Sequence, residues 1–195
     1  MVISGNLGPR GDGYVADQHM TSCEAADYHS CQISSLVDAG VDLITALTLP
    51  ETEEAIGIVQ ASQAADVPAV ISFTVETDGR LPNGQTLGSA IEAVDEATEN
   101  GPAYYMINCA HPTHFEQTLK DDGAWLQRIR GIRANASCKS HAELDESETL
   151  DDGNPEELGQ QYRVLRALLP RLTVLGGCCG TDHRHVEAIA RACRE

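Results

Sequence analysis

Short apolar runs alternate with longer amphipathic stretches along the chain, and this alternation constrains the fold more than any other feature. The predicted strands cover residues 2–4, 41–48, 67–74, 103–108, 129–135 and 172–175. Helical patterns follow them, at residues 25–39, 52–65, 87–99, 112–125, 155–169 and 182–193. Six strand–helix units of this length are typical of a parallel α/β fold. We expect residues 1–195 to form one domain.

The sequence is strongly acidic, with a formal net charge of −17 at pH 7. This charge argues against nucleic acid and anionic membrane surfaces as partners. It permits a cationic ligand, although a solvated surface is the simpler explanation. No run approaches 18 apolar residues, and the first residues do not have the pattern of a signal peptide. We therefore expect a cytoplasmic protein.

Seven cysteines give the chain an odd number of thiols, at positions 23, 31, 109, 138, 178, 179 and 193. In a protein that is not secreted, this favours reduced thiols or metal ligands over a disulfide framework. Cys178 and Cys179 are adjacent within a glycine-rich run, and glycine permits the sharp turn that two converging sulfurs need. Cys109 stands where a predicted strand ends. Three thiolates of this kind suit a zinc site with one open position.

Other roles for these thiols remain open from the residues alone. A cysteine at the end of a strand is often a small buried hydrophobe, which is an alternative for Cys109. Cys178 and Cys179 could instead form a strained disulfide, as in a redox protein. The remaining four cysteines are expected to be packing or surface residues.

Polar residues also follow the predicted strands. They are Asn6, Glu76, Asn108 and Asn135. In a (β/α)8 barrel the carboxyl ends of the strands carry the active site, and in an open parallel sheet they form the ligand edge. Either architecture would bring these residues and the thiols to one face.

The motif Gly176-Gly177-Cys178-Cys179-Gly180-Thr181, with an upstream Asn108-Cys109, resembles the homocysteine S-methyltransferase family. The segments 7–9, 72–76 and 133–137 are similar to that family as well. The resemblance covers essentially the whole chain and includes the betaine-dependent and S-methylmethionine-dependent types. It implies a TIM-barrel α/β fold.

The resemblance also implies a function. Cys109, Cys178 and Cys179 would be the zinc ligands, and the sulfur of homocysteine would take the fourth position. Zinc would keep that sulfur deprotonated, and it would take a methyl group from a sulfonium or quaternary ammonium donor to form methionine. Zn²⁺ is thus the expected cofactor, and homocysteine and a cationic methyl donor are the expected partners. Asn6, Glu76, Asn108 and Asn135 are the predicted substrate-binding residues.

Two departures from the family pattern affect these expectations. A complete barrel needs about 250 residues, and the chain has six units, so it resembles a barrel that lacks the two N-terminal units. Leu47 occupies a position where the family often has a glutamate that holds the amino acid's ammonium group, and Glu76 is a candidate substitute. A partial barrel has two open sheet edges, which invite pairing with another chain. We expect either a fragment of a longer gene product, which we favour, or closure by association with another copy of the chain. The alternative to methyl transfer is that the chain is a non-catalytic zinc-binding fragment or subunit with an incomplete substrate pocket.

Overall fold

Six parallel strands form a single sheet in sequence order in the computed structural model, which describes residues 1–17 and 19–194. The strands are β1 (Ser4–Leu7), β2 (Leu43–Leu49), β3 (Ala69–Phe73), β4 (Pro102–Asn108), β5 (Ile129–Ala134) and β6 (Val174–Gly177). Each strand pairs with its neighbour in the sequence, always in parallel. The prediction of a partial barrel of about six βα units is confirmed.

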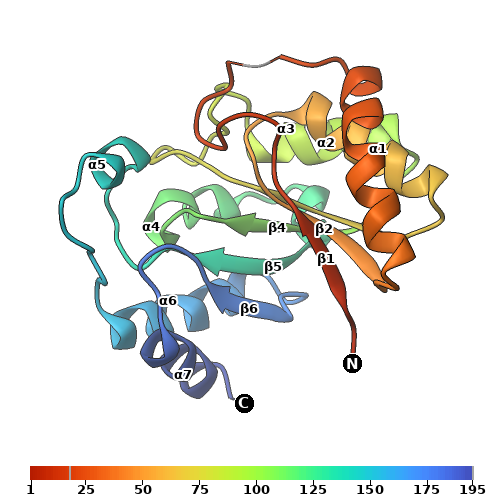
Figure 1. Ribbon diagram of the computed structural model, residues 1–195. Helices are drawn as coiled ribbons and strands as arrows, with labels where there is room; N and C mark the ends of the chain where they lie inside the picture. The colour runs from red at the N-terminus through yellow and green to blue at the C-terminus, as the bar shows by residue number, and fades with distance from the viewer. Residues whose placement is uncertain (18, 195) are drawn as a thin grey trace.

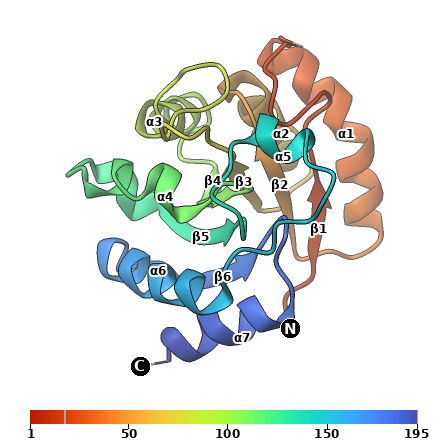
Figure 2. The same cartoon turned by 90° about the vertical axis from the view of Figure 1, so that its left-hand side faces the viewer.

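The helices lie around the outside of the curved sheet, except for the short helix His141–Asp145, which lies beyond the carboxyl ends of the strands (Figures 1 and 2). They are α1 (Ser22–Asp38), α2 (Thr52–Ala64), α3 (Leu87–Ala97), α4 (Pro112–Phe115), α5 (His141–Asp145), α6 (Pro155–Leu168) and α7 (His183–Ala192), with 3-10 turns at Thr118–Lys120 and Ala124–Arg128. Their starts follow from local sequence. Thr21 caps α1 through a reciprocal pair of hydrogen bonds with Glu24. Asn154 caps α6 and Pro155 is its first residue.

The hydrophobic core lies between the sheet and the helices. Ile44, Ile71, Ile107 and Ile132 come from four adjacent strands and are fully buried within it. Alternate residues of a strand face opposite sides of a sheet. Thr45, which follows Ile44, accordingly meets a polar group on the other face, where its Oγ1 lies 2.7 Å from the Ser4 Oγ. The inner face of the partial barrel is therefore partly polar and leads to the carboxyl ends of the strands.

Four elements differ from the sequence prediction. The helical pattern at residues 112–125 forms only the short α4 and two 3-10 turns. The first strand is Ser4–Leu7 rather than residues 2–4, because pairing of Asn6 and Leu7 with β2 overrides the low strand propensity of Gly5 and Asn6. The last strand is shifted by two residues to Val174–Gly177, where the two glycines pair with Arg133 and Ala134. The acidic stretch at residues 137–154 contains α5, which a Ser140–Glu143 capping box initiates.

Two features of the sheet frame the site. The carboxyl ends of all six strands meet at one edge, as parallel pairing requires. β1 and β6 are the outer strands, and they do not pair with each other among the described residues.

No helix in the described part of the chain is long and apolar enough to cross a membrane.

Candidate metal centre and its cavity

Three thiol groups meet at the carboxyl ends of β4 and β6. The Sγ atoms of Cys109, Cys178 and Cys179 all lie within 4.8 Å of one another, and those of Cys109 and Cys179 are 3.8 Å apart. β5 is the one strand between β4 and β6. All seven cysteines, including this group, are free thiols. The structure thus brings together the three residues that the sequence predicts as metal ligands.

Cys109 is turned toward the cluster by an unusual backbone conformation. Its φ is +55°, a left-handed value that only a few per cent of non-glycine residues adopt. Thr48 at the end of β2 has a φ of +61°. Asn108 joins these two turns, because its Oδ1 accepts from the Thr48 N–H at 2.8 Å and its Nδ2 donates to the Thr48 Oγ1 at 2.7 Å. Strain of this kind is typical of functional sites.

Two glycines permit the turn that carries Cys178 and Cys179. A Cβ on Gly177 would lie 2.1 Å from the Thr181 Oγ1. Gly180 has a φ of +76°, and a Cβ there would lie 2.6 Å from the backbone oxygen of Asp151. Only glycine fits both positions without displacement. The turn therefore depends on the glycines as much as on the thiols.

Backbone hydrogen bonds fasten this turn to the end of β5. The Cys178 N–H donates to the Ala134 carbonyl at 2.8 Å, and the Ala136 N–H donates to the Cys179 carbonyl at 3.0 Å. The side chain of Asn135 adds a second link, because its Nδ2 donates to the Cys109 carbonyl and its Oδ1 accepts from the Cys179 N–H. Asn135 thereby connects both cysteine-bearing segments.

The three thiols strongly influence one another's ionisation. Hydrogen bonds from Cys178 and Cys179 lower the pKa of Cys109. The hydrogen bond to Cys109 is in turn the largest cause of the raised pKa values of Cys178 and Cys179. Three ionised thiols at this spacing repel one another unless a cation lies between them. A set of three sulfur donors fits a soft metal ion such as zinc.

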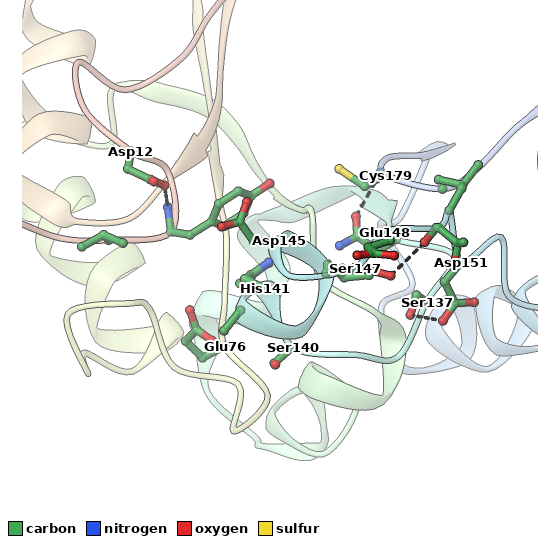
Figure 3. A pocket seen from close by; sticks show the side chains of 18 residues that line it. Asp12, Glu76, Ser137, Ser140, His141, Asp145, Ser147, Glu148, Asp151 and Cys179 are labelled. Carbon is green, nitrogen blue, oxygen red and sulfur yellow. Dashed lines mark hydrogen bonds between the residues drawn. The ribbon is translucent and has the colours of Figure 1, made fainter.

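A cavity of about 710 Å³ opens beside the cluster (Figure 3). Cys179, Asn135 and Glu76 line it, so the structure places three of the predicted site residues around one space. Asn6 does not line this cavity; it lines a separate hollow of about 470 Å³ together with Leu47. Asn108 is held against Thr48 and the Ser72 hydroxyl.

Tyr14 and His141 are among the residues of this cavity that the sequence does not identify as site residues. Tyr14 lies in the loop after β1 and His141 begins α5. Their rings stack with centroids 4.1 Å apart. The Ser140–Glu143 capping box could have indicated the start of α5, but no sequence signal could have paired two residues 127 positions apart.

Comparison with known proteins places the whole chain in one family. The sequence model described as "Homocysteine S-methyltransferase" matches residues 1–193. Homocysteine S-methyltransferase 1 of Arabidopsis thaliana is 24% identical over 204 residues, which cover 97% of this chain and 60% of that protein. Homocysteine S-methyltransferase YbgG of Bacillus subtilis is 24% identical over the same shares of each chain.

A solved structure shows the same fold. The metallated form of the homocysteine methyltransferase MmuM from Escherichia coli superposes with a TM-score of 0.72 at 20% identity, and the match covers 98% of this chain and 61% of that one. The chain thus spans about 60% of the length of the relatives described here. On the family match, which includes both cysteine-bearing segments, the chain belongs to the homocysteine S-methyltransferase family.

Proposed function

We propose that this chain acts in the transfer of a methyl group from a sulfonium or quaternary ammonium donor to the thiol of homocysteine, which forms methionine. The observation that carries the proposal is the cluster of Cys109, Cys178 and Cys179, which opens onto a cavity large enough for small substrates. Family membership and the names of the relatives support it.

In this proposal Cys109, Cys178 and Cys179 hold a zinc ion. When bound, zinc would lower the pKa of an acceptor thiol and so keep its sulfur nucleophilic near neutral pH. The name of the metallated MmuM structure supports a metal, and the three-sulfur donor set favours zinc. Free thiols persist in reducing compartments, so we place the protein in the cytoplasm as part of the same proposal.

The residues around the cluster position it and attract the donor. Asn135 fixes both cysteine-bearing segments, and Asn108 holds the turn at Thr48. Carboxylates along the cavity favour a cationic donor over an anionic one. During transfer a bond forms between the acceptor sulfur and the methyl carbon. The donor's bond to that carbon breaks, and its electron pair remains on the departing sulfur or nitrogen, so the leaving group is uncharged at that atom.

The substrate-binding roles of Asn6, Glu76, Asn108 and Asn135 stay proposals. Glu76 and Asn135 line the same cavity as Cys179, which supports their contact with a substrate there. Asn6 and Leu47 line the neighbouring hollow instead. If the ammonium group of homocysteine enters the larger cavity, Glu76 is the carboxylate that replaces the one absent at Leu47.

We further propose that residues 1–195 function as one barrel-type unit whose open sheet is completed by additional strands. The outer strands β1 and β6 leave hydrogen-bonding groups at two edges, and such edges recruit other strands. A second copy of the chain is the simplest source. Light scattering tests this point, because a chain that stays monomeric at micromolar concentration contradicts self-association.

Turnover tests the proposed function. The chain is purified under reducing conditions, and bound zinc and methyl transfer from S-methylmethionine or betaine to homocysteine are measured. We expect about one zinc per chain and formation of methionine. Cys178→Ala should lose both, whereas Cys23→Ala, on the exposed side of α1, should keep both. Zinc without turnover would favour a non-catalytic zinc-binding role, and a disulfide between Cys178 and Cys179 without zinc would favour redox chemistry.

A further inference from the structure

Two aromatic rings from segments far apart in the sequence stack beyond the carboxyl ends of the strands. Tyr14 belongs to the loop after β1, and His141 is the first residue of α5, beyond β5. The ring centroids are 4.1 Å apart and the ring planes are inclined by 29°. Both residues line the cavity of about 710 Å³ that reaches Cys179. The pair therefore forms one wall of that cavity.

Each ring is held in place by its own contacts. The His141 Nε2 lies 3.2 Å from the Val75 carbonyl oxygen, and because a carbonyl only accepts, this nitrogen donates. The Tyr14 N–H donates to the Asp12 Oδ1 at 2.8 Å. Gly13 lets the same loop approach β2, since a Cβ there would lie 2.8 Å from the Thr48 Cγ2. The stacked wall is thus supported by three strand ends, those of β1, β2 and β3.

Tyr14 also stands at the junction of two spaces. It lines both the larger cavity and the hollow of about 470 Å³ that contains Leu47. It shares the lining of the larger cavity with Cys179. A methyl donor in the larger cavity would consequently meet the ring of Tyr14 as it approaches the sulfurs.

The charge of this cavity selects for cations. Asp12, Glu76, Asp145 and Glu148 line it, and none of these four forms an ion pair with another described residue (Figure 3). No lysine or arginine is among the described residues that line it. Unpaired carboxylates raise the local concentration of cations. An aromatic face then binds sulfonium and quaternary ammonium groups through the cation–π interaction.

We propose that Tyr14 is the residue that recognises the onium group of the methyl donor, and that His141 is a positioning residue that fixes the Tyr14 ring. This inference rests on the proposed function, because it assigns a donor to the same cavity. The ligand class is a methylated sulfonium or quaternary ammonium compound. The positive charge of the ligand is attracted to the face of the Tyr14 ring, so an uncharged molecule of the same shape binds more weakly.

Calorimetry with paired ligands tests the assignment without any turnover. One arm compares S-methylmethionine with 2-amino-5-methylhexanoate, in which carbon replaces the charged sulfur. The other compares betaine with 3,3-dimethylbutanoate, in which carbon replaces the charged nitrogen. In the zinc-loaded wild-type chain we expect one charged ligand to bind about 3-fold to 30-fold more tightly than its carbon analogue. The arm that shows this preference identifies the type of donor.

Variants test whether the preference for the charged ligand over its carbon analogue depends on the rings of Tyr14 and His141. Tyr14→Leu should remove it, Tyr14→Phe should keep most of it, and His141→Ala should reduce it. Val186→Ala, at an exposed position of α7, is the control and should leave it unchanged. Zinc content is measured in each variant. If Tyr14→Leu loses zinc or fails to fold, the preference for the charged ligand in His141→Ala, which removes the stacked partner of the Tyr14 ring, decides the question.

The outcomes separate this inference from the proposed function. Equal binding of charged and uncharged ligands by the wild-type chain overturns the inference. So does an undiminished preference in Tyr14→Leu, even if methyl transfer to homocysteine proceeds. A preference that depends on Tyr14 in a chain that transfers no methyl group supports the onium site and contradicts the proposed function.

Discussion

The side chain of Asn135 holds Cys179 in place, because its Oδ1 accepts a hydrogen bond from the backbone N–H of Cys179 at 3.1 Å. The same side chain donates to the Cys109 carbonyl at 3.0 Å. Asn135 is 2% exposed, so these bonds form away from water and are costly to lose. The spacing of the thiols therefore depends on a residue that carries no sulfur.

Removal of this side chain should weaken zinc binding although all three thiols remain. We expect Asn135→Ala to lower zinc affinity roughly 10-fold to 100-fold, as loss of groups that orient metal ligands commonly does. Competition with a zinc chelator measures the affinity. Asn83→Ala, in an exposed turn, is the control and should bind zinc as the wild type does. Equal affinities of the two variants would contradict a positioning role for Asn135.

Tyr162 supports the same region from α6. Its hydroxyl accepts from the Ala134 N–H at 2.8 Å and donates to the Gly176 carbonyl at 2.6 Å. We expect Tyr162→Phe to lower the free energy of unfolding by about 1–3 kcal/mol, because a buried N–H is left without a partner. Urea denaturation measures the change. Tyr28→Phe, at a half-exposed tyrosine, should change it by less than about 0.5 kcal/mol.

Gly180 lies in the turn beside Cys179, and Gly84, in another loop, is a matched control for it. Both have a left-handed φ, +76° and +84°, so alanine is strained by about 1 kcal/mol or more at either position. Only at Gly180 would the new Cβ also collide with the Asp151 carbonyl, whereas nothing lies within 4 Å at Gly84. Gly180→Ala should therefore destabilise the chain more than Gly84→Ala and should reduce zinc retention. If the two variants lower the melting temperature equally, the collision with the Asp151 carbonyl does not destabilise the chain.

A buried pair anchors the loop that carries Tyr14. The Glu54 Oε1 lies 2.8 Å from the His29 Nε2 and accepts from the Arg10 N–H at 2.7 Å. Both side chains are at most 3% exposed. Glu54→Ala should cost about 1–3 kcal/mol in unfolding free energy, because it leaves the buried His29 Nε2 without its hydrogen-bond partner. Glu96→Ala, on the exposed side of α3, is the control, and a similar loss in both variants would contradict this anchor.

The order of the strands and the longer helices could be predicted from the sequence because most of these helices carry a side-chain cap at their start and each buried strand is an apolar run. β1 was misplaced for the opposite reason. Its residues have weak strand propensity, and its extent is set by pairing with β2. α5 was missed because five helical residues in an acidic stretch produce no apolar periodicity, although Ser140 and Glu143 do cap it.

The thiol cluster could be predicted because the carboxyl ends of parallel strands share one edge, which brings Cys109 and the Cys178–Cys179 pair together. The contact between Tyr14 and His141 could not. It depends on how two loops fold over that edge, and loop conformation is set by long-range contacts such as that of His141 with Val75. Asn6 was placed with the other site residues on the same reasoning about strand ends, yet it faces the neighbouring hollow.

X-ray absorption at the zinc edge decides whether these three cysteines hold the metal, because it counts sulfur ligands without requiring turnover. We expect three sulfur neighbours at about 2.3 Å in the zinc-loaded chain, and a fourth when homocysteine is added. Cys109→Ala should reduce the count by one or release the metal. A shell of nitrogen and oxygen ligands, or a sulfur count that homocysteine leaves unchanged, would contradict the assignment of these three cysteines to a methyl-transfer centre.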